Sequence, residues 1–160
     1  MEKNTGLFLV REGVPTVLSP GLTWLVLRNY DEFTVALYEY IEEHHEFPPL
    51  IVLTNNLADE HGLWFQNNIG GIPQFDKFRN KSGMHALSFL MQLSDMIKLP
   101  VKKLCINGTS HANMLLVNVY NSWRKEAGHL ESIPPAINSM DWMVKKEEDV
   151  TKDRGKDNQV

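Results

Sequence analysis

Short runs of apolar residues along the chain predict its strands. They occupy residues 6–10, 24–27, 50–53 and 101–106. Each run is bounded by polar residues, glycine or proline, which is typical of strands in the interior of an α/β protein. The run at residues 50–53 is the central one, and its uninterrupted apolar character indicates a strand of a parallel sheet that is covered on both faces.

Three longer segments carry apolar residues at the spacing of a helix. The first follows Asn29, a residue suited to cap a helix, and is expected to end near His44–His45. The second spans residues 82–98. The third begins after a further capping residue, Ser110, and Gly128 is placed to end it.

Strands that alternate with helices predict an α/β fold with a mostly parallel central sheet and right-handed crossovers. We expect residues 1–130 to form this domain, as a three-layer sandwich. Residues 131–144 are apolar and contain prolines, which indicates an extension that packs on the domain or on a partner. Residues 145–160 are almost wholly polar and charged, and they predict a disordered tail.

Length, charge and cysteine content indicate the number of domains, the kind of partner and the compartment of this protein. A length of 160 residues fits one domain, and a formal net charge of -4 argues against nucleic acid as a partner. Cys105 is the only cysteine, so no internal disulfide can form and a reducing compartment is expected. No stretch approaches the roughly 18 apolar residues of a membrane span, and the start lacks the apolar core of a signal peptide. We expect a cytoplasmic protein without membrane association.

The carboxyl end of the central strand is the expected place of a ligand, because parallel α/β sheets bind ligands at the carboxyl ends of their strands. Thr54, Asn55 and Asn56 stand at this end. None of the three side chains can ionise, so none can act as a general acid, a general base or a charged metal ligand. The sequence therefore predicts the position of a site without the usual catalytic groups.

Residues 58–79 form a polar loop that carries large aromatic side chains. Such a loop folds over the sheet as a lid, offers a contact surface to a partner, or is simply anchored to the core by its aromatic residues, and anchoring is the most frequent role. The apolar segment at residues 131–144 likewise either packs on the domain or contacts a partner. The aromatic residues that we assign to partner binding are Trp64, Phe65, Phe75, Phe78 and Trp142.

Four segments carry a resemblance to a known family. They are WLVLRNYDEF at residues 24–33, LADEH at 57–61, FDKFRNKSG at 75–83 and NGTSHANM at 107–114. In this order they resemble the cyclic-phosphate-processing receiver-like domain family of phage and bacterial proteins, over about residues 7–127. The resemblance implies a receiver-like fold, and the family's predicted activity is metal-assisted phosphoester chemistry on cyclic phosphates.

The positions that match the family's proposed catalytic residues hold other side chains in this sequence. At the end of the first strand the family has an Asp-Asp pair and a following Arg, and this sequence has Val10, Arg11 and Gly13 there. At the end of the central strand the family has Asp-His-Asp, and this sequence has Thr54, Asn55 and Asn56. At the start of the helix after the loop the family has Thr-Gly-Tyr-Asp, and this sequence has Ser82, Gly83, Met84 and His85. In the last strand the family's His-Ser pair is replaced by Leu104 and Cys105, while Asn107 is kept. A divalent cation on a phosphate needs anionic oxygen ligands, so we expect neither a metal nor a cofactor.

Anion binding without a metal is still compatible with these residues. Arg11 places a guanidinium where the family has a carboxylate, and guanidinium groups bind phosphate directly. The turn from Asn107 to Ser110 either cradles a phosphate through its backbone N–H groups or is simply a turn and cap. Arg28 is either a cation of the pocket or a structural ion-pair partner. The candidate ligand-binding residues are Arg11, Arg28, Thr54, Asn55, Asn56, Asn107 and Ser110.

An enzyme with relocated chemistry is a further alternative, built on His61, His85, Cys105 or His111. The cysteine would need one of these histidines nearby to become a thiolate. A buried structural cysteine is the simpler interpretation.

We predict a catalytically degenerate receiver-like domain, a pseudoenzyme that acts by binding a protein partner. The family's distribution suggests a phage-encoded modifier of a host process. The alternatives are a module that binds a phosphorylated small molecule or a nucleotide, and a cyclic-phosphate phosphoesterase with a relocated active site.

Overall fold

The computed structural model describes residues 1–10, 14–15, 21–54, 83–108, 110–139 and 144–145. The strands in this part of the chain are β1 (Thr5–Leu9), β2 (Val14–Pro15), β3 (Thr23–Leu27), β4 (Leu50–Leu53), β5 (Leu104–Asn107), β6 (Ile137–Ser139) and β7 (Val144–Lys145). The helices are α1 (Tyr30–His44), α4 (Gly83–Ile97) and α5 (His111–Glu126). Each strand and helix that the sequence predicts is present, with limits that differ by a few residues. Strands β2, β6 and β7 are not among the predicted elements.

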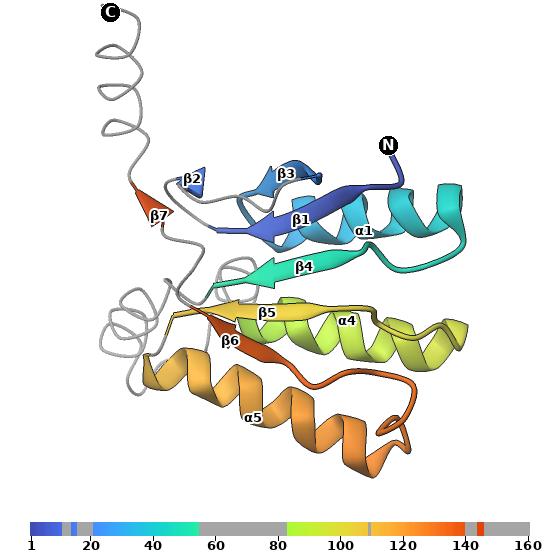
Figure 1. The fold of residues 1–160 in the computed structure, drawn as a ribbon, viewed down its shortest axis with the longest axis vertical. Coiled ribbons are helices and arrows are strands. Elements are labelled where there is room, and N and C mark those ends of the chain that lie inside the picture. Colours follow the sequence, from blue (N-terminus) through green and yellow to red (C-terminus); the bar gives the residue numbers. More distant parts are fainter. Residues whose placement is uncertain (11–13, 16–20, 55–82, 109, 140–143, 146–160) are drawn as a thin grey trace, which may run out of the picture.

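Five of the strands form one parallel sheet in the order β3-β1-β4-β5-β6. Figure 1 shows them side by side in this order, with the carboxyl ends of β1, β4 and β5 toward the same side of the molecule. Counted along the chain, the order is 2-1-3-4-5, which is that of flavodoxin-like folds. The predicted α/β fold with a mostly parallel sheet is confirmed.

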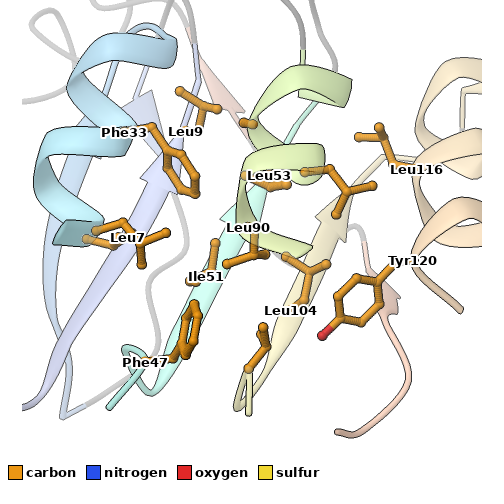
Figure 2. Close-up of a cluster of buried hydrophobic side chains, with 14 of the residues drawn as sticks. Leu7, Leu9, Phe33, Phe47, Ile51, Leu53, Leu90, Leu104, Leu116 and Tyr120 are labelled. Atoms are coloured by element: carbon orange, nitrogen blue, oxygen red, sulfur yellow. The ribbon is translucent and has the colours of Figure 1, made fainter. Parts of the chain in front are cut away.

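The three described helices lie on the same face of the sheet. Their buried side chains form one cluster with alternate residues of the strands, and α4 packs against both α1 and α5. Figure 2 shows this cluster, in which Phe33, Leu90, Leu116 and Tyr120 of the helices meet Leu7, Leu9, Ile51, Leu53 and Leu104 of the strands. Helix α1 joins β3 to β4, α4 joins β4 to β5, and α5 joins β5 to β6, so all three connections run across the sheet in the same direction. Right-handed crossovers that run in one direction place their helices on one face. None of these helices has the length and the apolar character that a membrane crossing requires.

The opposite face of the sheet carries a smaller cluster, made of Phe8, Val10, Leu50, Val52 and Cys105. The ring of Trp24 in β3 packs against this cluster and lies over Gly6 in β1, where a Cβ atom would stand 2.9 Å from a ring carbon. It also meets Phe8 edge-on, with 6.1 Å between the ring centroids. The glycine is therefore needed for the close approach of this tryptophan to the sheet.

The ends of α1 are set by capping contacts. The Asn29 side chain accepts a hydrogen bond from the backbone N–H of Glu32 (2.9 Å), and the Glu32 carboxylate accepts one from the backbone N–H of Arg28 (2.6 Å). His45 ends the helix in the left-handed conformation, with φ of 55°. Gly128 follows α5 with φ of 79°, a conformation that favours glycine. The predicted roles of Asn29 and Gly128 are confirmed.

The C-terminal part of the fold differs from the prediction. We expected an extension at residues 131–144 after a domain of residues 1–130, but Ile137–Ser139 is the edge strand β6 and pairs with β5. A run this short, preceded by two prolines, does not show the pattern of a strand in the sequence. Strand β7 pairs antiparallel with β2, so residues from both ends of the chain meet there. The predicted tail was residues 145–160, but Lys145 belongs to β7, and the residues from 146 onward lie outside the described part.

A buried arginine fixes the turn between α5 and β6. The Arg124 guanidinium donates hydrogen bonds to the backbone oxygens of Ile133 (2.6 Å) and Leu130 (3.2 Å). The Arg124 carbonyl accepts a hydrogen bond from the backbone N–H of His129 (2.7 Å). Hydrogen bonds from a charged donor contribute about 1.5–3 kcal/mol each. One side chain therefore holds the turn that leads into the last strand of the sheet.

Candidate functional site

The carboxyl ends of β1, β4 and β5 form the edge at which a flavodoxin-like sheet binds its ligands. The parallel pairing continues one residue beyond these strands, because the backbone N–H of Thr54 donates to Leu9 and that of Val10 donates to Leu27. From β1 the chain passes to β3 on one side, and then crosses to β4 on the other. The point at which the strand order reverses is therefore between β1 and β4, beside Thr54.

Thr54 and Asn107 stand on neighbouring strands at this edge. Leu53 pairs with Ile106, and each of the two polar residues directly follows one member of this pair. Side chains alternate along a strand, so both polar side chains lie on the face of the smaller cluster, which includes Cys105. Thr54 is 5% exposed and Asn107 is 9% exposed. The structure thus brings together two of the residues that the sequence predicts as ligand-binding.

The side-chain oxygen of Asn107 is buried and has no hydrogen-bond partner. Most buried side-chain oxygens have one, and an unpaired buried acceptor costs about 1–3 kcal/mol. At a ligand-binding edge, such an acceptor is free to take a hydrogen bond from a bound molecule or from water. Asn107 is therefore the strongest sign of a binding site at this edge.

Gly108 makes the turn that follows Asn107. Its φ of 114° is strained for residues with a side chain, and a Cβ atom would stand 2.5 Å from Asn113 Nδ2. The Asn138 amide of β6 donates hydrogen bonds to the carbonyls of Ile106 (3.1 Å) and Gly108. These contacts hold the backbone on both sides of Asn107, so the fold fixes the position of its unpaired oxygen.

Ser110 is the N-cap of α5. Its hydroxyl accepts a hydrogen bond from the backbone N–H of Asn113 (3.2 Å), and its carbonyl accepts one from that of Met114 (3.0 Å). The structure shows the capping role that the sequence predicts for Ser110, and the binding of a phosphate by the backbone of residues 107–110 stays a prediction. The hydroxyl that we assigned to ligand binding is engaged within the helix.

Arg28 stands at the carboxyl end of β3, and β1 and β4 separate it from β5. The structure therefore does not place it next to Asn107. The other residues predicted to bind a ligand or a partner lie outside the described part of the chain, and they are Arg11, Asn55, Asn56, Trp64, Phe65, Phe75, Phe78 and Trp142.

Two residues of the relocated-chemistry alternative, Cys105 and His111, have different surroundings in the structure. Cys105 is buried in the smaller cluster, whereas His111 is exposed in the first turn of α5. A buried cysteine of this kind packs as a small apolar residue. Within the described residues, His, Cys, Asp and Glu side chains do not gather in threes as metal ligands. His61 lies outside these residues.

A cluster that the sequence does not predict links the C-terminal ends of α4 and α5. The Asp95 carboxylate lies 2.9 Å from Trp123 Nε1, which donates to it, and 2.7 Å from His129 Nε2. The rings of Trp123 and His129 are 4.7 Å apart. Partial burial raises the pKa of Asp95, but the hydrogen bonds from Trp123 and His129 and the nearby imidazole outweigh it, so the pKa is lowered overall.

This cluster borders a cavity of about 240 Å³, whose lining includes Lys98 and Ser132. Helices of right-handed crossovers run antiparallel to the strands, so the cluster lies at the amino edge of the sheet, away from Asn107. Asp95 lies 28 and 34 positions from Trp123 and His129 in the sequence, and the three residues share no motif. The sequence alone could have indicated this contact only if the C-terminal ends of α4 and α5 had been predicted to lie side by side. We interpret it as a link between the helices.

Comparisons with family models, with curated proteins and with solved structures find no match to this chain. The resemblance to the cyclic-phosphate-processing receiver-like family therefore stays a prediction, and the function is argued from the geometry.

Proposed function

We propose that this chain acts by binding rather than by catalysis, and that the ligand is held at the carboxyl edge of the sheet beside Thr54 and Asn107. The position supports the proposal, because flavodoxin-like sheets hold ligands at this edge, next to the reversal of strand order. The chemistry of the two side chains supports it as well. Neither can ionise, so neither can act as a general acid or base.

The observation that carries the proposal is the unpaired side-chain oxygen of Asn107. An acceptor at this place favours a ligand with a hydrogen-bond donor, such as a peptide N–H or a hydroxyl group. Pairing the oxygen would recover part of its burial cost of about 1–3 kcal/mol, which corresponds to roughly one to two powers of ten in affinity.

A protein is the partner that we propose first, because a peptide backbone presents N–H donors at regular intervals. On the family resemblance, the chain would then be a degenerate, phage-encoded domain that modifies a host process. A phosphorylated small molecule or a nucleotide is the alternative. It would need a cation beside the site, and Arg28, the described arginine at this edge, is separated from Asn107 by two strands.

Replacement of Asn107 by leucine tests whether its oxygen is kept for a ligand. The change removes an acceptor that has no partner within the fold, so the free energy of unfolding in urea should stay the same or rise. Asn138→Leu is the matched control, because that amide donates to two carbonyls at the same edge. The control should lose about 1–3 kcal/mol. An equal loss in both variants would show that Asn107 is a structural residue and would contradict the proposal.

A ligand panel separates the classes of partner. Cyclic nucleotides, linear nucleotides and sugar phosphates are added to the wild-type protein with and without Mg²⁺ and Mn²⁺, and the thermal midpoint is measured. A ligand at 100 times its dissociation constant stabilises the fold by about 2.7 kcal/mol. A metal-independent shift that Asn107→Leu abolishes would assign the small-molecule alternative, and no shift supports a protein partner. Turnover of a cyclic phosphate would exclude the binding-only function.

A further inference from the structure

The outward face of α1 combines exposed apolar groups with carboxylates. Each of its residues has another of the group three or four positions away, which places them on one side of a helix. They are Asp31, Val35, Tyr38, Glu39 and Glu42. Val35 is 55% exposed and Tyr38 is 51% exposed. Two large side chains that are half exposed, side by side and surrounded by charge resemble the centre and rim of a binding surface.

The tyrosine on this face is held by the neighbouring helix. The ring of Tyr38 meets Phe89 of α4 edge-on, with 5.3 Å between the centroids, and Tyr30 meets the same phenylalanine at 6.0 Å. An aromatic side chain held in this way loses little conformational entropy when a partner binds, which is why rigid aromatics are frequent in binding hot spots. The apolar centre is thus already ordered in the free protein.

The carboxylates on this face are not neutralised by the described part of the chain. Asp31, Glu39 and Glu42 have no ion-pair partner there, whereas Glu43 pairs with the N-terminal ammonium group at 2.7 Å. Helix α1 contains no lysine or arginine at all. Glu42 also lies in the last turn, where a carboxylate opposes the helix dipole. Asp31 lies in the first turn, where the helix dipole favours a carboxylate. Glu39 and Glu42 are like charges three positions apart, which is unfavourable within the helix, and a cationic partner would compensate them.

We propose that this face docks a basic segment of a protein partner. The α1 surface is formed by Val35, Tyr38 and Phe89 at its centre and by Asp31, Glu39 and Glu42 around it. Lysine or arginine side chains of the partner pair with the carboxylates, and an arginine can also stack on the tyrosine ring. The negative charge repels nucleic acid and anionic lipid, and the apolar centre distinguishes a protein segment from a metal ion. The surface shares no residue with the carboxyl edge, so the inference does not depend on the ligand proposed there.

A synthetic peptide that contains lysine, arginine and tryptophan serves as the probe, and amide NMR spectra of the full-length protein report where it binds. We expect saturable shifts that are confined to α1 and to the outer face of α4. The same peptide with every cationic residue replaced by glutamate should cause no shift. A peptide of lysine and glycine alone should bind at least about tenfold more weakly, because it lacks the apolar contact.

Two double variants separate the α1 surface from a general charge effect. Glu39→Lys with Glu42→Lys should weaken binding of the peptide at least about tenfold. Glu126→Lys with Glu131→Lys makes the same change of net charge at exposed positions elsewhere, and affinity should stay within about twofold of wild type under the same salt conditions. Circular dichroism and the thermal midpoint establish that each variant is folded.

A third variant tests the apolar centre. Tyr38→Ala should also weaken binding about tenfold or more, since it removes the ordered aromatic group. The proposal would be overturned if the two charge variants lost affinity equally, or if Tyr38→Ala bound the peptide as tightly as wild type. It would also be overturned if the lysine–glycine peptide bound as tightly as the first peptide, or if the NMR shifts were centred outside α1 and α4. The Asn107→Leu variant should bind the peptide as wild type does, which separates this surface from the carboxyl edge.

Discussion

Two tyrosines of the core differ in what the fold provides for their hydroxyl groups. Tyr40 donates a hydrogen bond to the backbone carbonyl of Lys3, whereas the hydroxyl of Tyr120 is buried without a hydrogen-bond partner. In Figure 2 this oxygen points toward Leu104. Burial raises the pKa of both phenols, so both stay neutral at physiological pH. What distinguishes the two residues energetically is the hydrogen bond.

Replacement by phenylalanine should therefore have opposite effects at the two positions. Tyr120→Phe removes a buried polar group that has no partner, so the free energy of unfolding should stay the same or rise by up to about 1 kcal/mol. Tyr40→Phe should lower it by about 1 kcal/mol, because it leaves the Lys3 carbonyl without its donor. Urea denaturation measures both. A Tyr120→Phe variant that loses as much as Tyr40→Phe would contradict the prediction.

Gly108 combines a strained backbone conformation with a close neighbour. Gly108→Ala should lower the free energy of unfolding by about 2–4 kcal/mol, since φ is positive and the new Cβ would meet Asn113 Nδ2. Gly21→Ala is the control, because its φ of 82° is also positive but its Cβ would stand in open space. The control should lose only the backbone term of about 1–2 kcal/mol. Equal losses would show that Asn113 moves aside without cost.

At the scale of elements, the contact between α4 and α5 is expected to depend on pH. Asp95 in α4 faces Trp123 of α5 and His129 beyond it, and the pKa of this carboxyl is lower in the folded protein than in the unfolded chain. A lowered folded-state pKa contributes stability above the unfolded pKa, and this contribution is lost as the pH falls through the folded value. The link between α4 and α5 should therefore weaken in acid.

Asp95→Asn should make the stability less dependent on pH in the acid range. As the pH falls from about 5 through the ordinary aspartate pKa of 3.8 and below it, the free energy of unfolding of the wild type should fall more steeply than that of the variant. The measurement is urea denaturation at several pH values in one salt concentration. Parallel curves would show that other carboxylates cause the acid loss, and that the Asp95 cluster does not link the helices energetically.

The elements also show which features a single sequence reveals. The strands at residues 50–53 and 24–27 and the helix after Asn29 were predictable, because each follows from a local apolar pattern or a cap. Strand β6 was not, because its few residues gain their place only by pairing with β5. The same division holds for the site. The position of Asn107 at a strand end could be predicted, but its unpaired oxygen depends on which side chains surround it in the fold.

At the scale of the whole molecule, the sheet extends beyond the boundary expected at residue 130. Strand β6 completes the sheet, Ile133 is buried in the main core, and the Arg124 guanidinium needs the carbonyls of the following turn. The turn and the edge strand are therefore integral parts of the domain.

Two truncated chains test this boundary. A chain that ends after residue 130 should lose cooperative thermal unfolding, because Arg124 is left buried without acceptors and β5 becomes an edge strand. A chain that ends after residue 145 keeps β6 and β7 and should unfold with the midpoint of the full-length protein, within a few degrees. Circular dichroism during heating compares them. A cooperative transition of the shorter chain at the full-length midpoint would place the boundary at residue 130 after all.

The strand order also bears on how the protein folds. Strands β1 and β3 are close in the sequence, whereas β4 and β5 pair across the longest stretch of chain between any two neighbours in the sheet. Loop-closure entropy rises with the length of chain that is closed. We therefore expect the N-terminal half, from β1 to β4, to assemble early and the docking of β5 beside β4 to be the slow step. Thr54 and Asn107 meet only in that step, so the candidate site would be among the last features of the molecule to form.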